Sequence, residues 1–280
     1  TIKSDFTKEN LKKYKMPALA AAVMAAAGLA TGWGAAQLRP VPEGIAAGAV
    51  PQAGGAAQDT APRTPSLGET LTVSSLRRFL ENGEYAQAAV WMDVRREALS
   101  SLFYETLGGE AWLLGDSGWT DELEGEGIVL KKGSLVFCGE FADGKPEGEN
   151  LAFQVVNPGQ PRYDYSGGEW RDGKMNGPGR SGYCCYGSAA GTLRSEKLGR
   201  FRDDLLDGSF EYVIALGEDE EGLWRLEADG GVTVIDESWQ YDPACRVYRV
   251  MAVSDANMGY TLGVSEKDEI RWKNLLVWQE

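Results

Sequence analysis

The feature that most constrains this chain is a recurring arrangement of glycine and aromatic residues in its carboxyl-terminal half. In 139–144 and again in 168–173, a glycine stands two residues before an aromatic residue, and an Asp-Gly pair follows. Asp-Gly supplies the two positive-φ residues of a tight turn, so the aromatic residue falls on the first strand of a hairpin. The pattern therefore predicts consecutive antiparallel hairpins over 118–235, with turns at Asp143-Gly144 and Asp172-Gly173.

The spacing of the glycines indicates a repeat. Gly125 and Gly148 are 23 residues apart. Gly177 follows Gly148 after 29 residues, and Gly208 follows Gly177 after 31, so the loops between units hold six or eight extra residues. Insertions confined to loops are what stacked repeats tolerate. The 23-residue spacing predicts a fourth unit. It recurs in two later pairs, Gly199 with Gly222 and Gly208 with Gly231.

Two units carry the pattern most completely. They are 165–179, which reads YSGGEWRDGKMNGPG, and 137–153, which reads FCGEFADGKPEGENLAF. Both resemble the MORN repeat family, whose units join a Tyr-x-Gly-x-Trp/Phe stretch to a Gly-Lys turn and a Gly-x-Gly. The resemblance implies a curved, single-layer β-sheet of stacked hairpins with a binding or scaffolding role. Because Asp204 and Glu227 replace the turn glycine in the last two units, a less regular sheet is expected after Asp204.

The aromatic residues of these units are the candidate functional side chains. Glycines allow stacked hairpins to approach closely, and rings from successive units can then line one face as a ladder. Each ring is either buried in that ladder or presented to a partner. The candidates are Phe141, Tyr165, Trp170, Phe201 and Trp224. For Trp170 the buried position is expected, because stacked hairpins need aromatic side chains for their shared core.

A stretch near the amino terminus indicates a membrane segment. Residues 16–38 carry no charge, and as a helix they would span about 34 Å, enough for a hydrocarbon core of about 30 Å. Lysines crowd the preceding segment, 1–15, which the positive-inside rule places in the cytoplasm, with the repeat domain outside it. Two alternatives remain for this alanine-rich stretch: a cleaved signal peptide that releases a secreted protein, or a soluble helix.

The rest of the chain divides into three parts. Residues 39–65 form a Pro/Ala/Gly-rich linker, 66–110 a helical segment, and 111–280 the repeat domain. Within the helical segment, Asn82-Gly83 predicts a break, and one helical face should bury Val90, Val94, Ala98, Leu102 and Phe103 over 85–107. The FLENGEYAQA turn resembles a tetratricopeptide hairpin, but one such unit cannot bury its own faces. After the repeats, 232–235 and 245–253 are predicted strands, and 272–278 a strand or short helix.

The sequence contains few residues or motifs that would support catalysis or cofactor binding. The chain has no His, which excludes Ser-His and Cys-His nucleophile schemes within it. Residues 177–182 match G-x-G-x-x-G, but a strand follows where the dinucleotide fingerprint needs a helix, so these glycines belong to the repeat. The acidic runs near 203–207 and 218–221 do not have the spacing of a calcium loop. We therefore predict no catalytic residues, no cofactor and no metal ion.

The four cysteines lack the C-x-x-C spacing of a zinc site. Cys184 and Cys185 are adjacent on a predicted strand, so they should point to opposite faces. Four buried thiols are expected. In an exported domain, a disulfide from Cys138 or Cys245 to one of the adjacent pair is the alternative.

The net charge limits which classes of molecule can be binding partners. The chain carries −14 overall, and the first 40 residues hold six basic and two acidic residues, which leaves −18 on the remainder. Such an acidic body repels nucleic acid. The sequence thus predicts a non-catalytic, membrane-tethered interaction or scaffold module that presents its sheet to a protein. The alternative is an envelope module that stacks aromatic rings on glycan or cell wall. A carboxylate-only hydrolase is the third reading, disfavoured by the absence of any motif outside the repeat.

Overall fold

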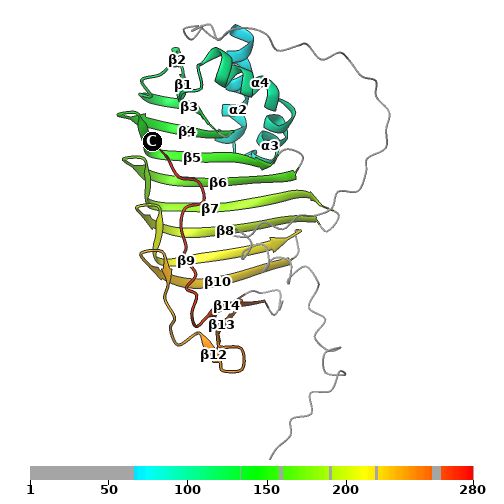
Figure 1. Cartoon of the computed structure of the whole chain (residues 1–280), viewed down its shortest axis with the longest axis vertical. Coiled ribbons are helices and arrows are strands. Elements are labelled where there is room, and N and C mark those ends of the chain that lie inside the picture. Colours follow the sequence, from blue (N-terminus) through cyan, green and yellow to red (C-terminus); the bar gives the residue numbers. More distant parts are fainter. Residues whose placement is uncertain are drawn as a thin grey trace, which may run out of the picture. The chain divides into compact units, whose positions relative to one another are not determined.

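The computed structural model describes most of the chain beyond Pro65 (Figure 1). The described ranges are 66–132, 134–157, 160–188, 191–217, 220–253 and 260–279. They belong to the second of two units, Gln58–Glu280, and the first unit is Thr1–Ala57. The predictions for 1–15, 16–38 and 39–65 fall outside the described residues. Within the described residues, every helix is too short or too polar to cross a bilayer.

The helical segment begins with a capping box. Ser66 Oγ accepts from the amide of Glu69, and the Glu69 carboxylate accepts from the amide of Ser66, which satisfies two donors at the start of α2. The helices are α2 (Leu67–Glu81), α3 (Tyr85–Val94), α4 (Arg96–Ser101) and a π-helix (Leu102–Thr106). The break after α2 falls at Asn82 and Gly83, as predicted, and Gly83 has a positive φ of 72°.

The predicted buried face of the second helix is wrong at Val90, Val94 and Ala98, which are exposed, and is confirmed at Leu102 and Phe103, which are buried. Val90 and Val94 are 50% and 75% exposed, and α3 instead buries Ala88, Ala89 and Met92. The helix α3 ends at Val94 and α4 begins at Arg96, so the predicted i, i+4 pattern combines residues of two separate helices.

Eleven strands form one open antiparallel sheet in the order β11-β10-β9-β8-β7-β6-β5-β4-β3-β1-β2. The strands before β6 are β1 (Trp112–Gly115), β2 (Gly118–Thr120), β3 (Gly125–Lys131), β4 (Leu135–Ala142) and β5 (Lys145–Asn157). The rest are β6 (Gln160–Arg171), β7 (Lys174–Ser188), β8 (Gly191–Arg202), β9 (Leu205–Leu216), β10 (Glu220–Asp229) and β11 (Val232–Thr233). Strands from β3 onward pair with their neighbours in sequence, which confirms the mainly-β, hairpin-built prediction.

Both predicted turns are confirmed. Asp143 and Gly144 have φ of 49° and 75°, and Asp172 and Gly173 have φ of 50° and 78°. The next turn contains Asp204 instead of glycine, yet Asp204 also adopts a positive φ, 68°. Its carboxylate accepts from the amide of Met175, and its own amide donates to the Met175 carbonyl. These bonds offset the strain, so this turn keeps the conformation of the two turns before it despite the loss of its glycine.

A hydrogen-bond ladder links successive turns and explains the glycine spacing. The first amide of each turn donates to a side chain one hairpin earlier. The donor-acceptor pairs are Asp143–Glu124 at 2.6 Å, Asp172–Glu147 at 2.8 Å, Asp203–Asn176 at 3.1 Å and Gly230–Asp207 at 3.3 Å. Each acceptor directly precedes one of the glycines Gly125, Gly148, Gly177 and Gly208. Each of the spacings of 23, 29 and 31 residues is therefore the length of chain from one hydrogen-bond acceptor of this ladder to the next, which is one structural repeat.

The fourth unit differs from its prediction. Its turn is at Gly230-Gly231, whereas Glu227 lies inside β10 opposite Ser209. In the three preceding hairpins the turn begins two residues after the aromatic residue, at Asp143, Asp172 and Asp203, and the strands shift register beside that residue. In the fourth hairpin the turn begins at Gly230, six residues after Trp224, and β10 and β11 pair without a shift. Gly222 and Gly231 therefore do not occupy the positions of the earlier glycines.

The sheet has a hydrophobic core on each face. Along β4, Val136 and Cys138 join the core under the helices, whereas Phe137 and Phe141 join the other. Successive side chains of a strand point to opposite faces, so the two cores lie on opposite sides of the sheet. We call these sides the helix face and the tail face. Figure 1 shows the helices at the β1–β6 end, and the contacts of α2 and α3 are with β1 and β3–β6.

The tail face is named for residues 270–279, the tail segment, which crosses the strands there (Figure 1). A separate three-stranded sheet precedes it: β12 (Gln240–Asp242), β13 (Val247–Met251) and β14 (Thr261–Ser265). The strand predicted over 245–253 is confirmed in β13, and that over 232–235 is reduced to β11. The prediction of a strand or short helix over 272–278 is wrong. The segment is extended, with isolated bridges at Arg271 and Lys273.

Candidate interaction groove

The five candidate aromatic residues are all buried. Phe141, Trp170, Phe201 and Trp224 belong to the tail-face core and are 2–3% exposed. Tyr165 belongs to the helix-face core and is 4% exposed. In this structure none of the five rings is available to stack on a partner.

Rings of the tail segment interleave with those of the sheet. The Trp278 ring centre lies 4.8 Å from that of Phe137 and 6.2 Å from that of Phe141. The Trp272 ring centre lies 5.2 Å from that of Phe210 and 4.8 Å from that of Tyr212. These are ordinary aromatic packing distances. The tail segment thus completes the core that the repeat aromatics begin.

Polar groups of the sheet also hold the tail backbone. The hydroxyls of Ser181 and Ser166, which are 3.1 Å apart, accept from the amides of Leu275 at 2.8 Å and Leu276 at 3.2 Å. Lys197 Nζ donates to the Lys273 carbonyl at 2.7 Å, and burial lowers the pKa of Lys197 to about 8. Buried backbone groups need such partners. The chain's own tail therefore occupies this face.

An open groove remains on the helix face. Its volume is about 600 Å³, and Leu80, Glu81 and Tyr85 form the wall on the helix side. Glycines of β4, β6 and β7 line its floor: Gly139, Gly167, Gly168 and Gly179. At Gly167 a Cβ would closely meet only the flexible Leu151 side chain, so this position leaves room for a partner to approach the backbone. At Gly139, Gly168 and Gly179 a Cβ would overlap the protein's own atoms.

Carboxylates border the groove. Glu126 lies opposite Glu140, and Glu149 lies opposite Glu169, so four neighbouring strands each bring a glutamate to this region. Arg77 binds Glu126 at 3.2 Å. In the described part of the chain, Glu140, Glu149 and Glu169 form no ion pair. Like charges directly opposite one another destabilise a sheet, so this arrangement carries a cost that a cationic partner would relieve.

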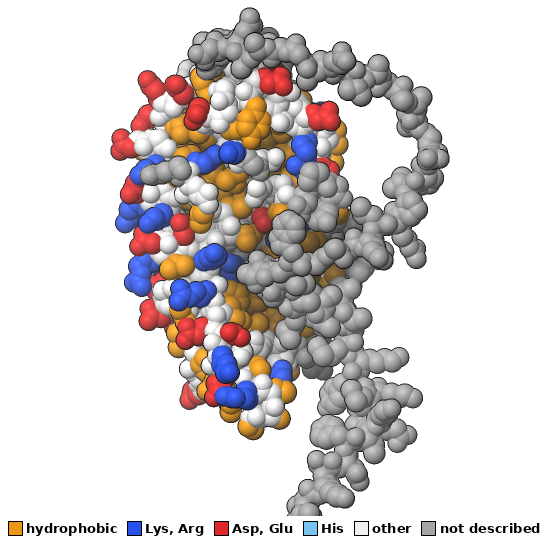
Figure 2. All heavy atoms as spheres, in the orientation of Figure 1, with side chains coloured by type: hydrophobic (Ala, Val, Ile, Leu, Met, Phe, Trp, Pro, Cys, Tyr) orange, Lys and Arg blue, Asp and Glu red, His pale blue; other side chains and the backbone are white. Residues whose placement is uncertain are grey.

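The hairpin turns are electrostatically different. Figure 2 shows acidic and basic side chains alternating along the edge of the sheet where the turns lie. There Lys145 binds Asp172 at 2.9 Å and Lys174 approaches Asp203 at 4.0 Å. These pairs join one turn to the next, so the charges of the turn edge compensate each other whereas those of the groove do not.

One end of the groove is held by arginine and tyrosine. Arg180 Nη2 donates to the Tyr85 hydroxyl at 2.8 Å, which ties β7 to α3. The Tyr165 hydroxyl donates to the buried Glu196 carboxylate at 2.7 Å. Burial, followed by this bond, raises the pKa of Tyr165, so the hydroxyl stays protonated. Both interactions hold that end of the groove rigid.

Asn150 supplies a second polar feature. Its side chain is buried, and its Nδ2 donates to the carbonyls of Glu147 at 2.8 Å and Glu140 at 2.5 Å. Its Oδ1 is buried without a hydrogen-bond partner among the described residues, and Asn150 lines the groove. An unsatisfied buried acceptor is costly, so a donor from a bound partner would be stabilised here.

The cysteines differ in exposure. All four are free thiols: Cys138 and Cys184 are buried, Cys185 is half-buried, and Cys245 is exposed, so the expectation of four buried thiols is wrong. Burial raises the pKa of Cys138 to about 12, and it also raises the pKa values of Cys184 and Cys185. Cys245 lies in the turn between β12 and β13, so no strand neighbour covers it.

We expect thiol labelling of the native protein at pH 8 to show one fast site, Cys245. The thiolate is the reactive species, so a thiol with a pKa near 12 reacts roughly a thousandfold more slowly than an ordinary cysteine. Ellman's reagent should titrate one thiol rapidly and all four after denaturation. Cys245→Ser should remove the fast phase, and a fast phase that persists in this variant would contradict the assignment.

The described residues contain no cluster of three or more Cys, Asp or Glu that could hold a metal ion. Residues 177–182 lie within β7, where no helix begins that could bind a pyrophosphate.

Neither family models nor curated protein sequences match this chain. Sequence reasoning missed Glu126, Glu149 and Arg180. Part of the signal was present, since a glutamate follows the first glycine of two repeats at 139–140 and 168–169.

Proposed function

We propose that this protein is a non-catalytic interaction module whose helix-face groove binds a basic, extended segment of a protein partner. One observation carries the proposal: an open groove with Gly167 in its floor is lined by Glu149, and Glu149 and the neighbouring Glu140 and Glu169 form no ion pair among the described residues. A glycine floor accepts a peptide backbone closely, and lysine or arginine side chains would compensate the carboxylates. Stacking on glycan requires exposed ring faces, and the five candidate rings are buried.

The resemblance to MORN repeats supports the same function class. The proposal includes the curved, single-layer stack of repeats that this resemblance implies. It also retains the membrane tether at 16–38, with the repeat domain outside the cytoplasm and 39–65 as the spacer. A tether of this composition would let the groove meet partners at some distance from the bilayer.

The test is a titration of the full chain, in detergent, with a fluorescent octapeptide of alternating lysine and glycine. We expect saturable binding that weakens steeply with salt, and no binding of the matching glutamate-glycine peptide. Gly167→Val should weaken binding at least tenfold. A Cβ there would meet the flexible Leu151 side chain at 3.2 Å, so the substitution fills the floor without displacing backbone.

The double variant Glu149→Gln/Glu169→Gln should also weaken binding at least tenfold. Glu237→Gln, which removes one exposed carboxylate in the turn after β11, is the matched control and should bind like wild type. Equal affinity for wild type and Gly167→Val would place the peptide elsewhere and refute the groove. Equal affinity for the glutamine double variant and the control would refute its electrostatic basis.

A further inference from the structure

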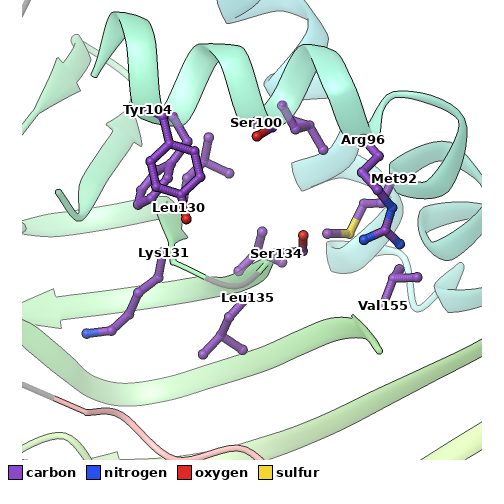
Figure 3. A pocket seen from close by; sticks show the side chains of 12 residues that line it. Met92, Arg96, Ser100, Tyr104, Leu130, Lys131, Ser134, Leu135 and Val155 are labelled. Carbon is purple, nitrogen blue, oxygen red and sulfur yellow. The ribbon is translucent and has the colours of Figure 1, made fainter. Parts of the chain in front are cut away.

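A second, smaller cavity lies between the helices and the β3–β4 hairpin (Figure 3). Its volume is about 110 Å³. Most of its lining is apolar, and the buried members are Met92, Phe103, Leu130, Val136 and Val155. A liquid water molecule occupies about 30 Å³, so the cavity has the volume of about four water molecules and can hold a small organic ligand.

Arg96 brings a cation to this apolar space. Its side chain is 28% exposed, and its Nη2 binds Asp93 at 3.1 Å. Its Nε is buried, and no described residue accepts a hydrogen bond from it. In Figure 3 the guanidinium reaches toward Met92 and Val155 at one end of the cavity. An unsatisfied charged donor beside apolar walls is costly unless an acceptor occupies the cavity.

The remaining polar groups are hydroxyls and a lysine. Ser100 and Ser134 lie at the cavity between Arg96 and Tyr104 (Figure 3). The Lys131 ammonium points away from it, lies 3.6 Å from the ring centre of Trp278 and donates to the Gln279 carbonyl. Arg96 therefore supplies the positive charge at this cavity, and the serines can donate to the same acceptor.

The backbone above the cavity is irregular. Residues Leu102–Thr106 form a π-helix, and Leu107 donates to the Leu102 carbonyl at 2.9 Å. Such single-turn π segments occur frequently at functional sites, because the wider turn displaces side chains from their α-helical positions. Here the segment contributes Phe103 and Tyr104 to the cavity lining.

We propose that this cavity binds a short-chain monocarboxylate of about four carbons. The carboxylate accepts from Arg96 Nε, with Ser100 or Ser134 as a further donor. The alkyl chain lies against Met92, Phe103 and Val136. A neutral alcohol of the same length would lose the charge-assisted bond, and an alkylammonium would be repelled by the guanidinium. The site is separate from the helix-face groove, so it does not depend on the peptide-binding proposal.

Calorimetric titration of the full chain with butanoate tests the proposal. We expect saturable 1:1 binding, at least tenfold tighter than for butan-1-ol, and none for butylammonium. Arg96→Gln should weaken butanoate binding at least tenfold, and Arg96→Lys should have an intermediate effect. Arg95→Gln is the matched control, because the Arg95 guanidinium lies 4.7 Å over the Trp91 ring outside the cavity.

Val155→Phe, which fills the cavity, should abolish butanoate binding but leave binding of the lysine-glycine peptide unchanged. A wild-type circular dichroism spectrum and melting temperature verify that this variant is folded. The absence of saturable butanoate binding to wild type would overturn the proposal and leave water as the occupant. Equal binding to wild type and Arg96→Gln would do the same.

Discussion

Replacing Trp170 by alanine should lower the free energy of unfolding by about 4 kcal/mol. The Trp170 side chain is 2% exposed, and its ring meets that of Phe137 edge to face at 5.6 Å. Its Nε1 also donates to the carbonyl of Asn150 at 3.1 Å. The substitution leaves a cavity in the tail-face core beside Phe137 and removes the partner of the Asn150 carbonyl. Chemical denaturation followed by circular dichroism measures the loss.

Tyr241→Ala is the control for Trp170→Ala. Tyr241 is 42% exposed and lies in the smaller sheet, so its loss should change stability by no more than about 1 kcal/mol. A Trp170→Ala protein with the wild-type denaturation midpoint would remove this ring from the core. It would also restore Trp170 as a candidate partner contact.

Replacing Gly168 by alanine should destabilise the protein by about 3 kcal/mol or more, from backbone strain together with steric overlap. Gly168 has a φ of 139°, which side-chain-bearing residues rarely adopt. A Cβ at this position would lie 2.5 Å from the Cα of Gly179 and would overlap the Pro178 carbonyl. Because both obstacles are backbone atoms of β7, the strands would have to separate to relieve the overlap. Thermal and chemical denaturation should both report the effect.

The adjacent Gly167 provides a matched comparison. Its φ is not in the left-handed region, and a Cβ there meets only the Leu151 side chain closely. Gly167→Ala should therefore change stability by no more than about 1 kcal/mol. Equal losses at the two positions would show that steric approach between β6 and β7 is not what requires glycine at Gly168.

Local patterns correctly predicted much of the sheet. The turns at Asp143-Gly144 and Asp172-Gly173 were predictable because their residue types favour positive φ independently of tertiary context. The break at Gly83 was predictable for the same reason. The positions of Asp204 and Glu227 in or outside a turn could not be predicted from residue type alone. Asp204 keeps its turn through bonds to Met175 and Asn274, both remote in sequence, and Glu227 is not in a turn.

The candidate sites required tertiary structure. The groove joins α2, α3 and strands β3–β8, and the cavity joins Arg96 to residues of β3–β5, so no single stretch of sequence contains either. The exposure of Val90 and Val94 shows the same limit, since helical periodicity identifies an apolar face but not what covers it.

By itself, the sequence determined the hairpin repeat, since turn residues and glycine spacing act over a few residues. Only the tertiary structure decided which side of the sheet can meet a partner. Trp272 and Trp278 of the tail segment lie far along the chain from Phe137, yet they pack onto the face that the repeat aromatics share. The hydrophobic effect is non-directional, so apolar rings on both segments bury each other wherever the chain can bring them together. That closure covers the tail face along the tail segment, whereas the helix-face groove stays open.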